Sequence, residues 1–283
     1  KATNADLLLA TDPDADRVGI AVKNGDEYRL LTGNETGVLL LDYLAKSKIE
    51  NGTMPKDPVL VKSIVTTSLA DEVAKSYGIT PINVLTGFKF IGEKIAHLEE
   101  KGEEKRFLLG FEESYGYLSG TYVRDKDAVV ASMLIVEMAA YYNSINSSIL
   151  EELEKIYKKF GRYLNKVDSF EFDGLSGMEK MKEIMANLRA NPPKEAAGFK
   201  VVKISDYKAH TVLEVASGNT EKIDLPAANV LVYDLENGSS FIVRPSGTEP
   251  KIKVYYSTKG SDLAQAEALR VELAKAVNKI LGF

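Results

Sequence analysis

The sequence predicts a mixed α/β protein whose pattern changes along the chain. Strand-like and helix-like segments alternate between residues 59 and 142, which is typical of a sheet with helices on its faces. Residues 163–256 instead hold several strand-like runs with one helical segment among them, and a long helical segment follows, which indicates an α+β domain with an antiparallel sheet. We therefore expect the end of one α/β domain, a complete α/β domain and a C-terminal α+β domain.

Changes in this pattern also place the domain boundaries. The end of the first domain should occupy residues 1–33, the complete α/β domain 34–146, a charged linker helix 147–163 and the α+β domain 164–283. The chain begins with Lys1 rather than Met, and only one strand precedes its first motif. Since that strand needs neighbours in a sheet, we expect the chain to be the C-terminal portion of a longer protein.

Composition excludes several classes of protein. The chain has 283 residues, of which 45% are hydrophobic and 27% charged, as in globular proteins. Its net charge of -5 argues against nucleic acid as a partner, and no apolar run is long enough to span a bilayer. No cysteine and only two histidines are present, which excludes disulfides and thiolate metal sites and disfavours histidine-rich ones. We expect a cytoplasmic protein without nucleic-acid or membrane partners.

The elements of the first half follow from hydrophobic periodicity. The apolar run Leu7-Leu8-Leu9-Ala10 predicts a buried strand. Residues 18–31 alternate as a hairpin does, and Asn24-Gly25 would supply a type I′ turn. The remaining strands are expected at residues 59–65, 81–85 and 106–111, and the helices at 35–46, 68–78, 88–98 and 128–142.

The second half begins with a charged helix over residues 147–161 and then changes to strands. Helices are expected at residues 178–188 and 262–280, and strands at 163–172, 199–204, 210–215, 229–233, 241–244 and 252–256.

An acidic loop follows the first strand. Pro13 cannot donate to a sheet ladder, so the strand should end there. In an extended loop alternate side chains point the same way, so Asp12, Asp14 and Asp16 would converge. Converging carboxylates repel one another unless a cation joins them, and hard oxygen ligands suit Mg²⁺ or Ca²⁺. Arg17 adds a fixed positive charge suited to a phosphate.

Other interpretations of this loop compete with a metal site. A solvated acidic turn explains the pattern equally well. An EF-hand is excluded because it needs Gly and Glu where Arg17 and Lys23 stand. A phosphatase of the haloacid dehalogenase type also places D-x-D after an apolar strand, but Ala15-Asp16 does not match the residues expected next.

Two later loops also carry chemistry. Glu112 and Ser114, after the strand at residues 106–111, offer a carboxylate and a hydroxyl to vicinal sugar hydroxyls. The alternative is an acidic loop without a ligand. The loop 244–250 offers a guanidinium, hydroxyls and exposed backbone N–H groups, as an anion-binding concavity does. A simple hairpin turn is the alternative.

Together the three loops resemble motifs of the α-D-phosphohexomutase superfamily, which includes phosphoglucomutases and phosphomannomutases. Residues 12–17 are similar to its metal loop D-G-D-x-D-R, residues 110–116 to its sugar loop G-x-E-E-S-x-G, and residues 244–250 to its phosphate loop R-x-S-G-T-x-P. The motifs occur in the family's order, and the resemblance extends over essentially the whole chain.

The resemblance implies a role for each matching residue. Asp12, Asp14 and Asp16 would bind Mg²⁺, with Arg17 assisting catalysis. Lys126 would transfer a proton, for which it needs a pKa lowered by Arg124 and the metal nearby. The implied substrate-binding residues are Thr86, Gly87, Phe88, Lys89, Glu112, Ser114, Arg124, Arg244, Ser246, Gly247 and Thr248. Glu113 replaces the Met that is more usual in phosphomannomutases, which favours glucose over mannose.

The implied reaction interconverts glucose 1-phosphate and glucose 6-phosphate through a phosphoserine and glucose 1,6-bisphosphate. The family's T-x-S-H-N-P serine loop does not occur in this sequence. We therefore expect the chain to be inactive alone and to need N-terminal domains as well as a phosphosugar. Three alternatives remain, namely another phosphosugar mutase such as a phosphomannomutase, a metal-dependent phosphatase with Asp12 as nucleophile, and a non-catalytic sugar-phosphate binding module.

Overall fold

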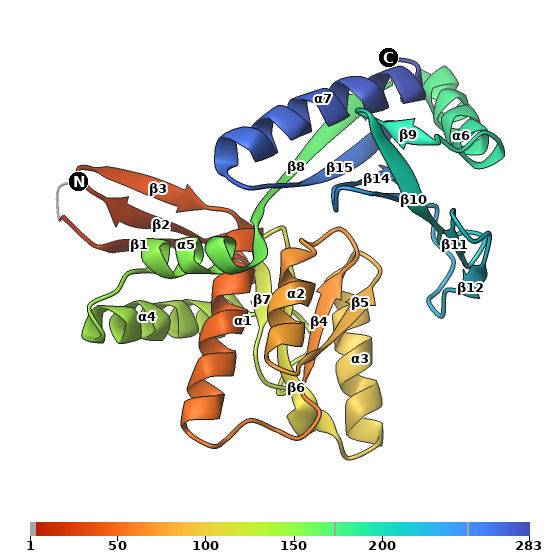
Figure 1. Cartoon of the computed structure of the whole chain (residues 1–283). Helices are drawn as coiled ribbons and strands as arrows, with labels where there is room; N and C mark the ends of the chain where they lie inside the picture. The colour runs from red at the N-terminus through yellow and green to blue at the C-terminus, as the bar shows by residue number, and fades with distance from the viewer. Residues whose placement is uncertain (1–3, 173, 248) are drawn as a thin grey trace. The chain divides into compact units, whose positions relative to one another are not determined.

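The computed structural model describes residues 4–172, 174–247 and 249–283, and it divides into two compact units (Figure 1). The first unit is Lys1–Phe160 and the second is Gly161–Phe283. Each unit has its own sheets and its own core. The finer division expected from the sequence remains a prediction.

The first unit begins with a three-stranded antiparallel sheet of β1 (Leu7–Thr11), β2 (Val18–Asn24) and β3 (Glu27–Leu31). The expectation that the first strand is buried is wrong, because Leu8 and Leu9 are 41% and 37% exposed. The reason is that β1 lies at the edge of this sheet and pairs only with β2. An apolar run predicts the strand but does not predict what covers it.

The turn between β2 and β3 also differs from the expectation. Asn24 pairs with Glu27, so the two turn residues are Gly25 and Asp26 rather than Asn24 and Gly25. A type I′ turn requires positive φ at both central residues. Of these two only Gly25 has it, at +63°. The hairpin is therefore confirmed, but its turn has the glycine-first pattern of type II′.

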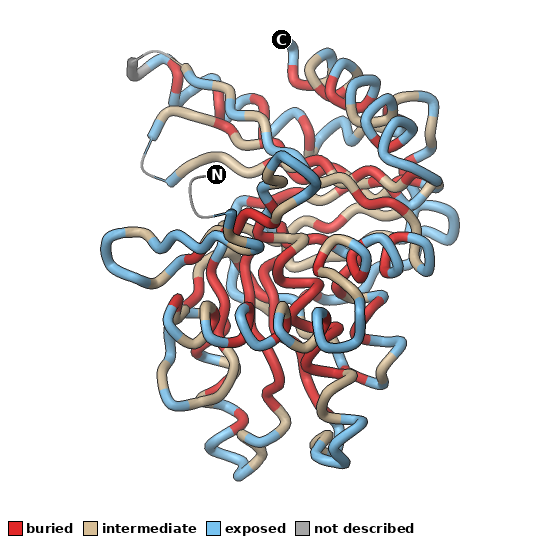
Figure 2. Tube along the Cα trace, turned by 90° about the vertical axis from the view of Figure 1, so that its left-hand side faces the viewer, coloured by how far each residue is buried: buried red, intermediate tan, exposed pale blue. Residues whose placement is uncertain are grey.

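The rest of the first unit alternates strands and helices as expected. Its four-stranded sheet has the order β5-β4-β6-β7, in which β5, β4 and β6 are parallel and β7 is antiparallel to β6. All residues of β4, β6 and β7 are buried, whereas β5 is mostly accessible, and Figure 2 shows buried residues gathered in the interior. The strands are β4 (Val59–Ser63), β5 (Thr80–Val84), β6 (Phe107–Glu112) and β7 (Gly116–Leu118), and the helices are α1 (Gly33–Glu50), α2 (Leu69–Ser76), α3 (Phe88–Glu100), α4 (Ala128–Ser144) and α5 (Ile149–Phe160), with a 3₁₀ turn η1 (Glu104–Arg106).

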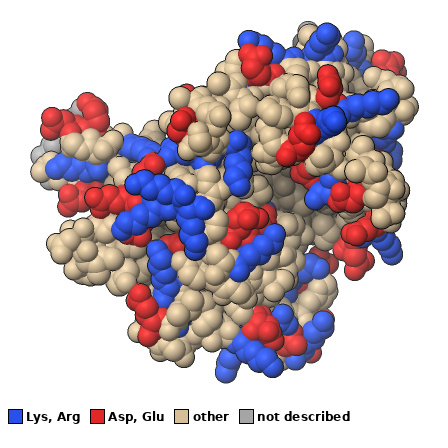
Figure 3. Space-filling view, in the orientation of Figure 1, with Lys and Arg blue, Asp and Glu red and all other residues tan. Residues whose placement is uncertain are grey.

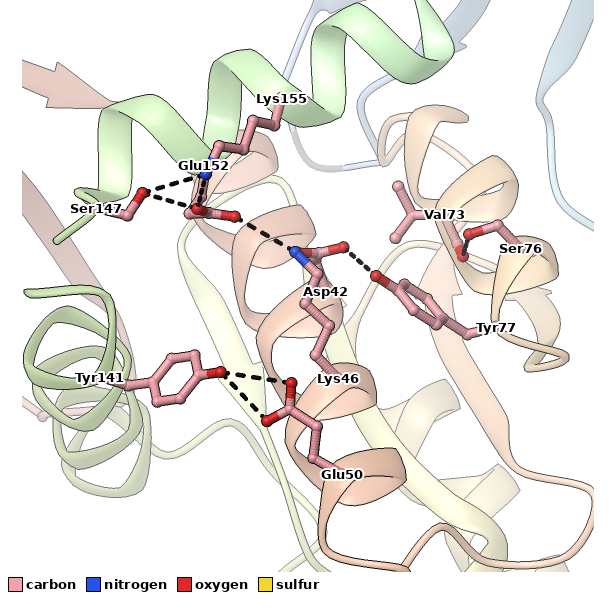
Figure 4. A network of polar contacts seen from close by, with 10 residues as sticks. All are labelled: Asp42, Lys46, Glu50, Val73, Ser76, Tyr77, Tyr141, Ser147, Glu152 and Lys155. Atoms are coloured by element: carbon pink, nitrogen blue, oxygen red, sulfur yellow. Dashed lines mark hydrogen bonds and ion pairs between the residues drawn. The ribbon is translucent and has the colours of Figure 1, made fainter. Parts of the chain in front are cut away.

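A charged network joins α1 to α5 and to Tyr77, the residue that follows α2 (Figure 4). On α1, Asp42 accepts a hydrogen bond from the Tyr77 hydroxyl at 2.7 Å and pairs with Lys46 at 2.7 Å. Lys46 also contacts Glu152 of α5 at 3.3 Å, and Lys155 contacts the same residue at 2.5 Å. Because the carboxylates of Asp42 and Glu152 are buried, each needs such cationic partners. The network therefore attaches α5 to α1.

The second unit is the expected α+β domain. Its antiparallel sheet has the order β12-β11-β10-β13-β14-β15-β8, and β9 pairs with β10. Helices α6 (Gly174–Ala190) and α7 (Leu263–Leu281) contribute to one apolar core with the central strands. The strands are β8 (Arg162–Glu171), β9 (Glu195–Ala196), β10 (Phe199–Asp206), β11 (Thr211–Glu214), β12 (Thr220–Lys222), β13 (Leu231–Leu235), β14 (Ser240–Pro245) and β15 (Lys251–Gly260).

Two surface properties complete the description. Basic and acidic side chains are interspersed over the face shown in Figure 3. Among the described residues, no single helix is long and apolar enough to cross a membrane. Helices α4 and α5 together have the length and apolar composition of a membrane span, but the chain bends by 87° between them.

Candidate functional site

The acidic loop brings its three carboxylates together. Oxygen atoms of Asp12, Asp14 and Asp16 all lie within 4.8 Å of one another. The loop is a tight turn rather than the expected extended segment, with Ala15 at a φ of +55°. The carboxylate of Asp12 accepts hydrogen bonds from the backbone N–H groups of Asp16 at 3.2 Å and Arg17 at 3.0 Å. The convergence was predicted, but these internal bonds produce it.

The carboxylate cluster fits a hard divalent cation. The Oδ1 atom of Asp16 is buried and has no hydrogen-bond partner within the described parts of the chain. Nε of Arg17 lies 3.6 Å from this oxygen. The N–H of Arg17 is the largest influence on the pKa of Asp12 and holds it below its ordinary value, so this ligand is ionised at neutral pH. Three carboxylate oxygen donors at this spacing suit Mg²⁺, which prefers carboxylates and water.

Glu112 lies at the carboxyl end of β6 and is only 6% exposed. Its Oε1 accepts a hydrogen bond from the N–H of Gly87 at 2.7 Å. Burial raises the pKa of Glu112, and the Gly87 N–H opposes that rise. Gly87 has a φ of +120°, which only glycine adopts without strain. This bond links the loop at residues 86–89 to the loop at residues 110–116, both of which are predicted to contact the sugar.

Backbone hydrogen bonds connect the metal loop to the sugar loop within the first unit. Arg17 forms an antiparallel bridge with Gly116. The N–H of Val18 donates to the carbonyl of Tyr115 at 3.2 Å. The carbonyl of Ala15 accepts from the N–H of Ala128, the first residue of α4, at 3.1 Å. The structure therefore places the two predicted sites side by side.

Lys126 lies at the metal loop, but its environment differs from the expectation. Its Nζ is 2.5 Å from Asp16 and 3.2 Å from Asp125. Burial lowers the pKa of Lys126, but these carboxylates outweigh it and hold the pKa above its ordinary value. The guanidinium of Arg124 instead donates to the carbonyl of Thr121 at 2.6 Å and pairs with Glu99 of α3. The expected lowering of the pKa by Arg124 is therefore not found.

The loop at residues 86–89 contributes less side-chain surface than expected. Phe88 is 4% exposed and belongs to the core around α3, so its ring is packed against protein. The hydroxyl of Thr86 is buried and finds no hydrogen-bond partner among the described residues. Nζ of Lys89 lies 5.0 Å from the centre of the Phe90 ring. Substrate contacts from this loop remain predictions.

The predicted phosphate loop lies in the second unit and joins β14 to β15. Arg244 lies opposite Lys253 near the end of β14, and Pro245, opposite Ile252, is its last paired residue. The N–H of Ser246 donates to the carbonyl of Lys251 at 2.8 Å, which closes the loop. A Cβ added to Gly247 would meet nothing within 4 Å, so the backbone there is open to a ligand. Thr248 lies outside the described residues.

Sequence reasoning missed a buried polar cluster behind the sugar loop. Lys62, Ser63 and Thr66 lie at the end of β4 and in the turn that follows, which ends the strand earlier than expected. The signal in the sequence is the pair Lys62-Ser63, which interrupts the apolar run of residues 59–65. That signal does not identify what the lysine faces.

Known proteins resemble this chain over most of its length. Residues 32–160 match the phosphoglucomutase/phosphomannomutase α/β/α domain III, and residues 178–276 match the C-terminal domain of the same family. The phosphoglucomutase of Staphylococcus aureus (strain MRSA252) is 40% identical over 262 residues, which are 92% of this chain and 46% of that protein. The phosphoglucomutase of Staphylococcus saprophyticus is 40% identical over 257 residues, with 90% and 46% covered. The chain therefore spans less than half the length of these relatives.

Solved structures support the same fold. The open form of parafusin, a phosphoglucomutase from Paramecium, aligns with a TM-score of 0.70 at 21% identity, covering 99% of this chain and 46% of that one. A phosphoglucomutase/phosphomannomutase family protein from Burkholderia thailandensis aligns with a TM-score of 0.62 at 15% identity, covering 100% and 48%. With two adjacent domains of one family matched in order, this chain belongs to the phosphoglucomutase/phosphomannomutase family.

Proposed function

We propose that this chain supplies the metal, sugar and phosphate sites of a phosphoglucomutase. The reaction is the interconversion of glucose 1-phosphate and glucose 6-phosphate through a phosphoserine and glucose 1,6-bisphosphate. One observation carries the proposal, namely the hydrogen-bonded connection between the carboxylate cluster and the loop of Glu112. The phosphoglucomutase relatives at 40% identity favour glucose phosphates over other phosphosugars.

Each site has a distinct task in this proposal. Asp12, Asp14 and Asp16 hold Mg²⁺, which would neutralise charge on the transferring phosphoryl group. Arg17, beside two of these carboxylates, adds positive charge to the same region. Glu112 and Ser114 hold the sugar hydroxyls. The non-reacting phosphate is held by the predicted phosphate loop, which contains Arg244, Ser246, Gly247 and Thr248.

Lys126 is a candidate for proton transfer. Its Nζ lies 2.5 Å from Asp16, one of the carboxylates that we assign to the metal, so it is placed to exchange a proton beside that site.

A phosphatase with Asp12 as nucleophile has less support. One oxygen of the Asp12 carboxylate already accepts two backbone hydrogen bonds that shape the loop. These bonds stabilise the ionised carboxylate as a ligand and reduce its nucleophilicity.

The test uses the protein at the length of its phosphoglucomutase relatives, in a coupled assay of glucose 6-phosphate formation from glucose 1-phosphate. We expect Mg²⁺-dependent conversion that requires a trace of glucose 1,6-bisphosphate and falls strongly in Asp14→Asn. Glu72→Gln is the matched control, since it removes one charge from the exposed surface of α2. Release of inorganic phosphate without isomerisation would refute the mutase proposal and favour a phosphatase.

A further inference from the structure

A buried ammonium group lies behind the sugar loop. The side chain of Lys62 is 3% exposed, and its Nζ is 3.1 Å from Oδ2 of Asp71 on α2. The same Nζ donates to the carbonyl of Thr66 at 3.3 Å. Burial lowers the pKa of Lys62, while Asp71 and Glu113 oppose that change. A buried cation requires such partners, so the arrangement around Lys62 is strongly constrained.

The side chain of Glu113 points toward this cluster. The side chain of Glu112 instead binds the N–H of Gly87. Oε2 of Glu113 lies 3.3 Å from the hydroxyls of both Ser63 and Thr66, and either hydroxyl can donate to it. The two hydroxyls belong to buried residues and share a hydrogen bond at 2.8 Å, so one donates to the other and its partner donates to Glu113. The carboxylate of Glu113 thus reaches the end of β4, 50 residues away in sequence. Its charge also lies close enough to Lys62 to influence that group.

The start of α1 holds the same turn through its backbone. A Cβ built on Gly33 would lie 2.1 Å from the carbonyl oxygen of Glu113 and 2.8 Å from the nitrogen of Tyr115. The Asn34 side chain next to it accepts from the N–H of Thr67 at 2.9 Å, which ties α1 to the turn after β4. The sugar loop is therefore held at its backbone by α1 and at the Glu113 side chain by the end of β4.

We propose that Glu113 is a positioning residue that fixes the turn carrying Glu112 and Ser114. The hydroxyls of Ser63 and Thr66 bind its carboxylate, and Lys62 compensates its charge. This inference rests on the proposed sugar-binding role of Glu112 and Ser114. Glu113 itself does not touch the sugar, so it affects glucose and mannose phosphates alike.

That consequence revises the expectation from sequence that Glu113 selects glucose. A carboxylate that contacts the sugar would change the ratio of affinities for the two sugars. A carboxylate bound to Ser63 and Thr66 changes how well the turn is ordered before any sugar binds.

The experiment compares four variants of the 283-residue chain with the wild type. Glu113→Ala removes the anchor, and Glu113→Gln keeps an acceptor oxygen without the charge. The double variant Ser63→Ala/Thr66→Val removes both donors while nearly preserving shape. Glu72→Gln is the matched control, because it removes one carboxylate from the exposed surface of α2. Amide hydrogen exchange of residues 110–118 is measured without ligand, and urea unfolding gives global stability.

We expect exchange at residues 112–116 to become about tenfold faster in Glu113→Ala and in the double variant, which corresponds to the loss of one hydrogen bond. Glu113→Gln should show a smaller increase, and Glu72→Gln none. Unchanged exchange in Glu113→Ala would overturn the proposal. So would an equal acceleration over the whole first unit, because that result indicates a general loss of stability.

Binding of glucose 6-phosphate and mannose 6-phosphate is then measured by calorimetry. We expect Glu113→Ala to weaken both by the same factor, about tenfold, and a change in their ratio would refute the positioning role. If the wild type binds neither sugar phosphate, the proposed role of Glu112 and Ser114 fails. The exchange measurement still decides whether Glu113 holds the turn.

Discussion

Gly33→Ala tests the packing of α1 against the sugar loop. Gly33 is the first residue of α1, where Thr32 and Glu35 form a capping box. Its φ is not in the left-handed region, so backbone conformation alone does not demand glycine there. Helix propensity predicts that alanine stabilises a helix relative to glycine by up to about 1 kcal/mol. The structure predicts the opposite result.

The reason is a contact that cannot relax by rotating a side chain. The new Cβ would lie 2.1 Å from the carbonyl oxygen of Glu113 and 2.8 Å from its carbonyl carbon, and both are backbone atoms. Either α1 or the turn must move, and overpacking of this kind costs about 1–3 kcal/mol. For a unit of this size that corresponds to a fall in Tm of about 2–12 °C.

The assay is urea unfolding combined with calorimetric binding of glucose 6-phosphate. Gly19→Ala is the control, because its added Cβ would meet only the ring of Tyr115, at an ordinary 4.0 Å. We expect Gly33→Ala to lose stability and sugar-phosphate affinity together, and Gly19→Ala to lose neither. A Gly33→Ala protein as stable as the wild type, or more stable, would refute the close approach described here.

Two further predictions concern the second unit. Arg244→Ala in the longer protein should lower kcat/KM for glucose 1-phosphate about 10- to 150-fold, the usual effect of losing a charge-assisted bond, and should leave Mg²⁺ affinity unchanged; an unaltered kcat/KM would show that the loop is only a turn. Arg189 binds Asp206 through two contacts, at 2.8 and 3.1 Å. Burial raises the pKa of Asp206, but Arg189 outweighs burial, so the pKa in the folded state is below its ordinary value. The ionised carboxylate therefore stabilises the folded state at any pH above the pKa of Asp206 in the unfolded chain. That stabilisation is lost as the pH falls through the lower pKa of the folded state. In Arg189→Met, the free energy of unfolding should therefore fall less below about pH 4 than it does in the wild type. An identical pH dependence of the unfolding free energy in the two proteins would contradict this.

Local patterns in the sequence were sufficient to predict most helices and strands. The helix at residues 35–46 was predicted from its apolar face, and the capping box of Thr32 and Glu35 moves its start to Gly33. The antiparallel character of the second unit followed from strands that succeed one another without helices between them. The short strands β7, β9 and β12 were missed, because two or three residues give no periodicity to recognise.

Features that depend on distant partners were not predicted. The burial of β1 depends on what lies over its sheet. The residues that form the turn between β2 and β3 depend on the pairing register of these strands, and a shift of one residue changes them. The convergence of the three carboxylates was predicted because these residues are close in sequence, although the turn that joins them was not. The contact of Glu113 with Ser63 spans 50 residues, and no pattern in either segment encodes it.

The last prediction is that residues 1–283 alone do not isomerise glucose phosphates. Moving a phosphoryl group between two hydroxyls through the protein requires a nucleophile that carries it. The proposed metal site needs all three carboxylates of Asp12, Asp14 and Asp16, so none of them is free to become phosphorylated. Ser114 is assigned to sugar hydroxyls, and neither His97 nor His210 stands beside a serine in the sequence.

We would assay the chain with Mg²⁺, glucose 1-phosphate and a trace of glucose 1,6-bisphosphate, and then add the separately produced N-terminal portion suggested by the longer relatives. We expect no turnover by the chain alone and partial recovery on mixing. Robust turnover by the chain alone would show that a nucleophile is present among these residues and that the assignment of their roles is wrong.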